Sequence, residues 1–471
     1  MSYDAVIVGA GPNGLAAAIT LQREGLKVLL LEAKETVGGG MRTTGLTLPG
    51  FLHDVCSAIH PMGAASPFLR TLPLHEFGLE YLHPEVLAAH PFDDGTAAVL
   101  YQSIADTAAG FGQDGAAYRR LFEPLVERWP QIESHILGPM LKWPNNPLAL
   151  GAFGFKSLQS AKQIATQFKG RHLRGLWAGI AAHSMIPLES LTSSAIAFVL
   201  TIAGHRTGWP IPKGGSQQIA DALAAYFCSL GGTIEVNTPV SALRDLPESK
   251  ALLFDTSPKQ LMQICGDRLS ALYRWQLQRH RYGMGVIKVD WALSEPTPFM
   301  AASVRRAGTV HLGGSIEEIA AGEHEVWQGK HPEKPYVLFA QPSLFDDTRA
   351  PANQHTGWAY CHVPNGSTRD MTEAITAQVE RYAPGFRDTI LGTHTFNTAA
   401  MESYNPNYIG GDINGGVVNI TQLFNRPVLG FSPYRTSAKG LYLCSASTPP
   451  GGGVHGMCGF YAARQALKDC F

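Results

Sequence analysis

The stretch that decides the fold is Ala5-Val6-Ile7-Val8-Gly9-Ala10-Gly11-Pro12-Asn13-Gly14. Its first four residues form a continuous apolar run with β-branched side chains, which predicts a buried parallel strand. The run is followed by the spacing Gly-x-Gly-x-x-Gly, formed by Gly9, Gly11 and Gly14. In a dinucleotide-binding turn the first glycine permits the tight bend and the second lets the backbone approach a pyrophosphate. The third lets the following helix pack closely on the strand.

A helix and a second strand complete the unit. An Ala- and Leu-rich stretch over residues 15–24 ends at Gly25, and the apolar run 27–31 ends at Glu32. We therefore predict a βαβ unit whose helix N-terminus offers free amides to phosphate groups. A carboxylate at position 32 would accept hydrogen bonds from ribose hydroxyls and repel a 2′-phosphate. This favours FAD or NAD over NADP.

The composition argues against several other classes of protein. The 37 Lys and Arg residues balance 38 Asp and Glu residues, so the net charge of −1 disfavours a nucleic-acid partner held by phosphate neutralisation. Hydrophobic residues make up 45% of the chain and charged residues only 16%, which predicts a large core rather than extensive disorder. The longest apolar run, 194–204, is about half the length that a membrane-spanning helix needs.

Cysteine and histidine usage bears on compartment and metal binding. None of the seven cysteines forms a Cys-x-x-Cys pair, which disfavours a dithiol centre, a zinc ribbon and a disulfide framework. The 17 histidines show no metal-binding spacing, so we predict no metal site. The N-terminus enters a strand pattern without a basic segment or cleavage site, and we expect a cytoplasmic protein. Residues 148–169, preceded by Trp143, fit either a helix that dips into a membrane or a helix of the core.

The residues after Glu32 carry a first family resemblance. Glu32 begins a Glu-x₅-Gly-Gly run, with Ala33 next to it, that resembles the second signature of flavoproteins of the glutathione-reductase and amine-oxidase type. In those families the glycines let the backbone pass beside the flavin side of the pyrophosphate, which implies cofactor-binding roles for Ala33, Gly39 and Gly40. The same families place an arginine directly after the glycine pair, where this chain has Gly40. Arg42, two residues later, is therefore either a phosphate partner or a surface residue.

The C-terminal segment 440–464 carries a more specific resemblance. Its apolar strand and its Pro-Pro-Gly-Gly-Gly loop resemble the FAD-closing motif of phytoene-dehydrogenase-like oxidoreductases. The resemblance implies that Ser445 stands where relatives often have glycine, and that Gly453, Gly456 and Met457 line the isoalloxazine ring. Amides at the start of the last helix would then stabilise negative charge on the reduced flavin.

The resemblance covers essentially the whole chain. Matching blocks begin at Leu48, Gly208 and Asn405, and Val240 falls where the family's backbone brackets the adenine. The block at Asn405 resembles the branch near carotene ketolases and mitochondrial pyridine nucleotide-disulfide oxidoreductase-domain proteins, and we expect it near the substrate. The implied fold class is α/β, with a glutathione-reductase-type FAD-binding Rossmann domain and an interleaved substrate domain of mixed sheet and helices.

The two domains are expected to alternate along the chain. We assign residues 1–70, 205–256 and 411–471 to the FAD-binding domain, and residues 71–204 and 257–410 to the substrate-binding domain. The stretch 107–204 is predicted to be mostly helical. We expect its helices to be broken at prolines, which include Pro124 and Pro130.

The expected chemistry follows from the predicted cofactor and from the absence of a second nucleotide-binding turn and of a dithiol motif in the sequence. With a single Gly-x-Gly-x-x-Gly turn of this quality and no dithiol motif, a disulfide reductase is disfavoured. We expect a non-covalently FAD-dependent dehydrogenase or oxidase that removes hydride from an apolar, polyene or isoprenoid substrate and passes electrons to oxygen or a quinone. The alternatives are an amine or amino-acid oxidase, a redox-neutral flavin isomerase, and a flavin-bound scaffold protein with little turnover.

Few side chains are candidates for catalysis. Lys288 lies in a segment that resembles the amine-oxidase strand whose lysine holds a water at flavin N5; the alternative is an ordinary strand lysine that faces solvent. His455, inside the glycine loop, would contact substrate or flavin, or make a structural hydrogen bond. His53, Asp54 and His60 would shape the flavin pocket or serve the fold alone.

Overall fold

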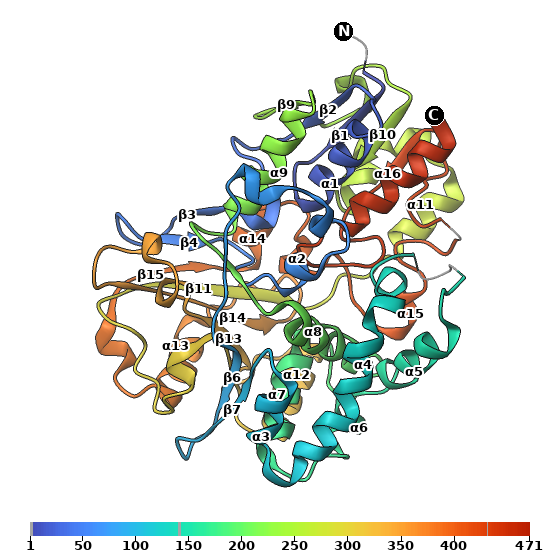
Figure 1. Ribbon diagram of the computed structural model, residues 1–471. Coiled ribbons are helices and arrows are strands. Elements are labelled where there is room, and N and C mark those ends of the chain that lie inside the picture. Colours follow the sequence, from blue (N-terminus) through green and yellow to red (C-terminus); the bar gives the residue numbers. More distant parts are fainter. Residues whose placement is uncertain (1–2, 140–142, 431) are drawn as a thin grey trace.

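The structure of the protein is a computed structural model, and it describes residues 3–139, 143–430 and 432–471. The predicted βαβ unit is present as β1 (Ala5–Val8), α1 (Pro12–Gln22) and β2 (Val28–Leu31). It belongs to a five-stranded parallel sheet in the order β16-β10-β1-β2-β9. The other strands are β9 (Thr233–Glu235), β10 (Ala251–Phe254) and β16 (Leu441–Leu443). Three separate parts of the chain therefore build one nucleotide-binding unit, at the top of Figure 1.

Helices cover both faces of this sheet. Side chains alternate along a strand, so Ile7 packs with α1 while Val8 packs on the opposite face. The α1 face also holds α9 (Gln217–Ser229) and α16 (Met457–Cys470). The Val8 face is covered by α10 (Pro258–Cys265) and α11 (Ala271–Gln278). Residues 258–278, which we assigned from the sequence to the substrate-binding domain, thus pack on the nucleotide-binding sheet.

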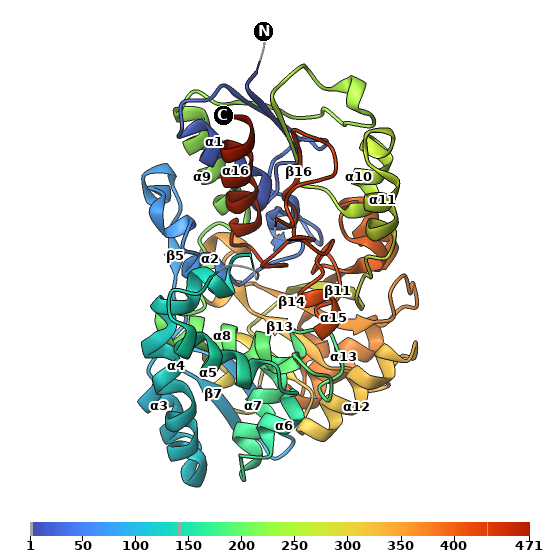
Figure 2. The same ribbon diagram turned by 90° about the vertical axis from the view of Figure 1, so that its right-hand side faces the viewer.

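A second, seven-stranded sheet lies below the first in Figures 1 and 2. Its strand order is β15-β11-β14-β13-β12-β6-β7, and its pairs are antiparallel except for β12 with β6. The strands are β6 (Val86–Pro91), β7 (Ala97–Leu100), β11 (Gly285–Leu293), β12 (Ala307–Leu312), β13 (Val337–Ala340), β14 (His355–Val363) and β15 (Ile390–Phe396). The predicted mixed sheet is therefore confirmed.

The two faces of the large sheet have different neighbours. One face packs against α13 (Thr372–Tyr382) in a wholly apolar cluster. The other face belongs to the main core, together with α7 (Arg171–Ala182), α8 (Ser193–Thr207) and α12 (Ile316–Trp327). The shorter elements are α2 (Pro61–Ala65), α3 (Ile104–Ala109), α6 (Ala161–Ala165), α14 (Thr398–Tyr404), α15 (Ile420–Leu423), β3 (Thr43–Gly45), β4 (Leu52–Asp54), β5 (Tyr81–Leu82) and β8 (Ile211–Pro212).

The helical region corrects one prediction. Helix α4 (Gly115–Ile136) continues through Pro124 and Pro130, so the breaks expected there are wrong. An internal proline costs about 3 kcal/mol because it removes a backbone hydrogen bond and crowds the preceding turn. Here an amphipathic face that includes Phe122 and Trp129 is buried against the core, and this burial outweighs the local penalty.

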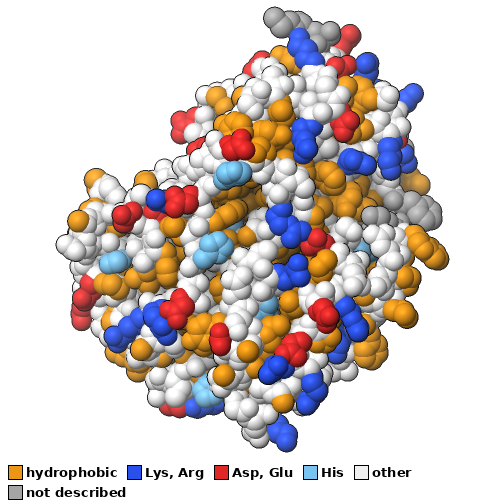
Figure 3. All heavy atoms as spheres, viewed as in Figure 1, with side chains coloured by type: hydrophobic (Ala, Val, Ile, Leu, Met, Phe, Trp, Pro, Cys, Tyr) orange, Lys and Arg blue, Asp and Glu red, His pale blue; other side chains and the backbone are white. Residues whose placement is uncertain are grey.

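Helix α5 (Pro147–Ser157) displays apolar side chains outward. Leu148 is 87% exposed and Phe155 76% exposed, while Phe153 is buried in the core. Figure 3 shows hydrophobic side chains along the right-hand edge of the molecule, where α5 lies in Figure 1. No helix within the described residues is long and apolar enough to cross a membrane.

Candidate functional site

A cavity of about 600 Å³ lies between the two sheets. It begins at the carboxyl ends of β1, β2 and β10, where open parallel sheets bind their ligands. It continues to the inner face of the seven-stranded sheet, where β12, β13 and β14 line it. We call the two parts the nucleotide end and the substrate end. Such a volume is in the range of ordinary ligand pockets.

The glycine turn lets a ligand approach its backbone closely. Gly9 and Gly11 line the cavity, and Gly9 has a φ of +98°, which favours glycine. A Cβ atom on Gly14 would lie 1.8 Å from the carbonyl oxygen of Gly9, so only glycine lets α1 pack this tightly on the turn. The helix begins at Pro12 and has no side-chain cap at Gly11, so its first amides, apart from that of Gly14, which donates to Asp255, are left to a ligand.

Glu32 lies beside this turn, at the end of β2. One carboxylate oxygen accepts a hydrogen bond from the Ala10 amide at 2.9 Å and the other accepts one from the Lys34 amide, also at 2.9 Å. Its remaining lone pairs are available to ribose hydroxyls, since Glu32 and its neighbour Ala33 both line the cavity.

Arg42 is part of the wall of the cavity and not a surface residue, because it is only 8% exposed. Its guanidinium donates to the carbonyl oxygen of Thr36 at 2.6 Å and lies 3.2 Å from the carboxylate of Glu32. The structure also explains why no arginine follows the glycine pair. A Cβ atom on Gly40 would lie 2.1 Å from the hydroxyl of Tyr408, so a larger side chain has no room.

The first part of the block at Asn405 lies at the nucleotide end and not near the substrate, while Asn414, farther along the block, reaches Met185 at the substrate end. Residues 404–408 line the cavity next to the glycine runs. The hydroxyl of Tyr404 donates to the carbonyl oxygen of Gly39 at 2.7 Å, and the side chain of Asn407 donates to the carbonyl oxygen of Asp255 at 2.9 Å. The block therefore covers the dinucleotide-binding turn.

Asp255 is a site residue that sequence reasoning missed. It follows β10 directly, lines the cavity and accepts a hydrogen bond from the Gly14 amide at 2.9 Å. Burial raises its pKa to about 7, and the nearby charge of Glu32 acts in the same direction. The available signal was a polar residue directly after the apolar run 251–254, the same pattern that identified Glu32.

The residues predicted from the C-terminal motif fall into two layers. Ser445 and Gly453 line the cavity, as does Val240 from the middle of the chain. Gly456 and Met457 lie behind the wall, where a Cβ atom on Gly456 would approach the Cβ of Ala16 to 2.8 Å. These two residues fix the start of α16 against α1, and their contact with an isoalloxazine ring stays a prediction.

His455 has a structural place in this loop. Its Nδ1 accepts a hydrogen bond from the Met457 amide at 3.0 Å, and its carbonyl oxygen accepts one from the hydroxyl of Ser66 at 2.6 Å. The ring is buried, and burial lowers its pKa to about 4. These contacts hold the N-terminus of α16, while a catalytic role for His455 stays a prediction.

Lys288 is buried on β11, so the interpretation as a solvent-facing strand lysine is wrong. Its ammonium group is paired with the carboxylate of Asp290 and lies 5.8 Å from the ring centroid of Trp358, which lines the cavity. Burial lowers the pKa of Lys288, and the charge of Asp290 opposes this shift. To act at flavin N5, Lys288 would have to reach the flavin past the ring of Trp358. This action stays a prediction.

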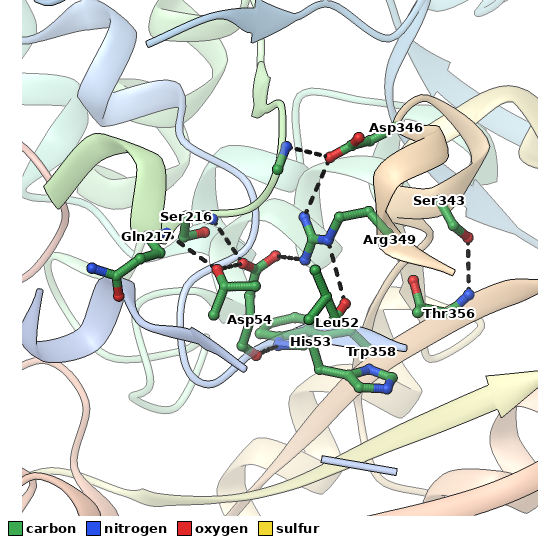
Figure 4. A network of polar contacts seen from close by, with 12 residues as sticks. Leu52, His53, Asp54, Ser216, Gln217, Ser343, Asp346, Arg349, Thr356 and Trp358 are labelled. Carbon is green, nitrogen blue, oxygen red and sulfur yellow. Dashed lines mark hydrogen bonds and ion pairs between the residues drawn. The ribbon is translucent and has the colours of Figure 1, made fainter. Parts of the chain in front are cut away.

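A buried polar network joins the two units next to the cavity (Figure 4). One carboxylate oxygen of Asp54 accepts from Arg349 at 2.6 Å, and the other accepts from the Ser216 amide at 2.8 Å. The Trp358 indole donates to the carbonyl oxygen of Asp54 at 2.9 Å. His60, which lines the cavity, hydrogen-bonds to the hydroxyl of Ser216 at 2.7 Å. This network fixes the cavity wall between β4, α9 and β14.

The substrate end is mostly apolar. Its lining residues come from four regions of the chain and could not be grouped from the sequence: His183, Met185, Leu200, Trp209, Thr309, Leu338, Ala340, Trp358 and Tyr360. Among the described residues, the carboxylates that line the cavity are Glu32 and Asp255, and both lie at the nucleotide end.

Comparison with known proteins agrees with this architecture. Residues 7–72 match the family described as the NAD(P)-binding Rossmann-like domain. The chain is 25% identical to the mouse pyridine nucleotide-disulfide oxidoreductase domain-containing protein 2, over 99% of this chain and 94% of that protein. It is 23% identical to a lycopene-forming phytoene desaturase of Paracoccus sp., over 97% of this chain and 95% of the desaturase. Among solved structures, a putrescine oxidase variant superimposes with a TM-score of 0.63 and 19% identity, over 99% of this chain and 98% of the oxidase.

Proposed function

We propose that the protein uses non-covalently bound FAD to oxidise an apolar substrate, because it is similar over nearly its whole length to a phytoene desaturase and shares the fold of a putrescine oxidase variant. The electrons would pass to oxygen or to a quinone. The cavity supports this proposal because it joins a dinucleotide-binding turn to a mostly apolar end.

The residues at the nucleotide end suit FAD. The turn at Gly9 and Gly11 suits the pyrophosphate, Glu32 the ribose, and Val240 the adenine. The hydroxyl of Thr256, which lines the cavity here, is buried without a protein partner and can serve the cofactor. Bound flavin would supply the hydride-accepting ring, while the protein orients the substrate and excludes water.

The absence of a counter-charge favours a neutral substrate over an amine. An ammonium group at the substrate end would lose its hydration without meeting a carboxylate, since both lining carboxylates among the described residues are at the nucleotide end. This single observation leads us to prefer a neutral polyene or isoprenoid-like molecule as substrate. The amine-oxidase alternative would have to hold an ammonium group with the aromatic rings of the described wall alone.

The proposal can be tested on the purified protein. We expect a yellow protein that releases FAD, identified by chromatography, when it is denatured by heat. After anaerobic photoreduction, stopped-flow mixing with oxygen and with a soluble quinone should show rapid reoxidation by one of the two. Retention of flavin on the denatured polypeptide would refute non-covalent binding. No reoxidation by either acceptor would refute the oxidoreductase and favour the isomerase or the scaffold. Failure to bind FAD would refute the proposal and both of these flavin-binding alternatives.

We propose a cytoplasmic protein whose helix α5 makes a peripheral membrane contact on its outward side and so delivers an apolar substrate. Leu148 and Phe155 are exposed on this short helix, next to the exposed Trp143. Co-sedimentation with phosphatidylcholine–phosphatidylglycerol vesicles should fall when Phe155 is replaced by Ser. A Leu272→Ser variant, which removes an exposed leucine from α11, is the control. Equal sedimentation of wild type and Phe155→Ser would refute the contact.

A further inference from the structure

The substrate end contains a polar group that an entirely hydrocarbon ligand would not need. His183 follows α7 and lines the cavity among Met185, Leu200 and Trp209. Its Nε2 lies 2.9 Å from Nε2 of His311, a fully buried residue on β12. The His183 ring is therefore fixed from behind by a second imidazole, with its other edge left to the cavity.

Both imidazoles are neutral at physiological pH. Burial lowers the pKa of His183 to about 3, and it holds the pKa of His311 well below its ordinary value. One Nε2 atom therefore carries the shared hydrogen and the other accepts it. If His183 donates, its Nδ1 is an acceptor; if His183 accepts, its Nδ1 is a donor. Among the described residues, this Nδ1 has no hydrogen-bond partner.

A second unpaired polar group lies on the same wall. Thr309 is two residues before His311 on β12, so both side chains are on the same face of the sheet. Thr309 lines the cavity and is 2% exposed, and its hydroxyl oxygen is buried without a hydrogen-bond partner. A buried hydroxyl is normally paired, so this unpaired one is available to a polar group of a ligand in the cavity.

We propose that His183 and Thr309 bind a hydroxyl or carbonyl oxygen carried by an otherwise apolar substrate. A hydroxyl can accept from one of these groups and donate to the other, and a carbonyl can accept from either. A carboxylate or ammonium group is disfavoured because the neutral pair offers no counter-charge. The inference rests on the proposed function for the apolar class of the substrate and adds to it one polar group.

The test compares ligands that differ in a single oxygen. Geraniol, farnesol and geranylgeraniol are each titrated against the hydrocarbon of the same skeleton, by quenching of tryptophan fluorescence in the FAD-loaded protein under anaerobic conditions. Trp209 and Trp358 line the cavity, so binding there should be visible without turnover. We expect at least one alcohol to bind roughly tenfold more tightly than its hydrocarbon, as one well-placed hydrogen bond to a buried group would give.

Variants test whether Thr309 and His183 cause the tighter binding of the alcohol. Thr309→Val and His183→Phe should each remove most of it, while Thr309→Ser should keep it because the hydroxyl remains. Thr201→Val is the matched control, since Thr201 also has a buried, unpaired hydroxyl but does not line the cavity. Equal binding of every alcohol and its hydrocarbon, or a preference that survives both Thr309→Val and His183→Phe, would overturn the inference. Flavin content and reoxidation are measured separately, so these outcomes are independent of the proposed redox function.

Discussion

Replacing Arg349 with Met should lower the free energy of unfolding by about 3–5 kcal/mol, the usual cost of removing one partner of a buried ion pair. The side chain of Arg349 is fully buried, and its guanidinium lies 2.6 Å from the carboxylate of Asp54 and 3.8 Å from that of Asp346. Without it, two carboxylates would remain in the interior and lose the cation that pairs with both of them. Burial alone would raise the pKa of Asp54, but the charge and hydrogen bond of Arg349 outweigh this and hold the pKa below its ordinary value of 3.8.

Urea unfolding, followed by tryptophan fluorescence, measures the loss in Arg349→Met, Asp54→Asn and the double variant. Because the folded-state pKa of Asp54 is lowered, its stabilisation is fully present above the unfolded-state pKa and is lost as the pH falls through the folded-state value. The difference between wild type and Arg349→Met should therefore shrink in acid. Arg306→Met is the control, since its pair with Glu85 is exposed and should be worth less than about 1 kcal/mol. A loss at Arg349 no larger than at Arg306 would refute the reasoning.

Three further changes test the cofactor site. Glu32→Ala should weaken FAD binding by about 1.5–3 kcal/mol, or roughly 10- to 150-fold. The control Glu35→Ala, at an exposed residue, should keep its flavin after dialysis. If Glu32→Ala keeps its flavin as well, the assignment of Glu32 to the ribose is contradicted. Gly11→Val should abolish FAD binding, because a Cβ atom there already meets a carboxylate oxygen at 2.8 Å; full flavin content would contradict the phosphate cradle. Lys288→Met should keep FAD and slow reoxidation by oxygen roughly 10- to 1000-fold; equal rates would leave Lys288 as the counter-ion of Asp290 alone.

The sequence predicts those parts of the fold that depend on short contiguous patterns of residues. The turn at Gly9 constrains the backbone within a few residues, so the βαβ unit follows from local chemistry. The continuous helix through Pro124 does not follow, because burial of its apolar face against distant segments overrides local propensity. The wall that holds His183 and Thr309 is also invisible in the sequence, since it forms only when α7 meets β12.

The charge distribution of the cavity also assigns a role to His183. In a desaturation, loss of hydride from carbon leaves a proton to be removed, and a histidine at the substrate end would be the obvious base. Yet burial lowers the pKa of His183 to about 3, which makes it a weak base, and the ring behind it is just as neutral. No lining carboxylate among the described residues reaches this end. His183 is therefore better suited to hold an oxygen atom of the substrate than to remove its proton, and the same neutrality keeps the apolar wall free of a charge that would attract water.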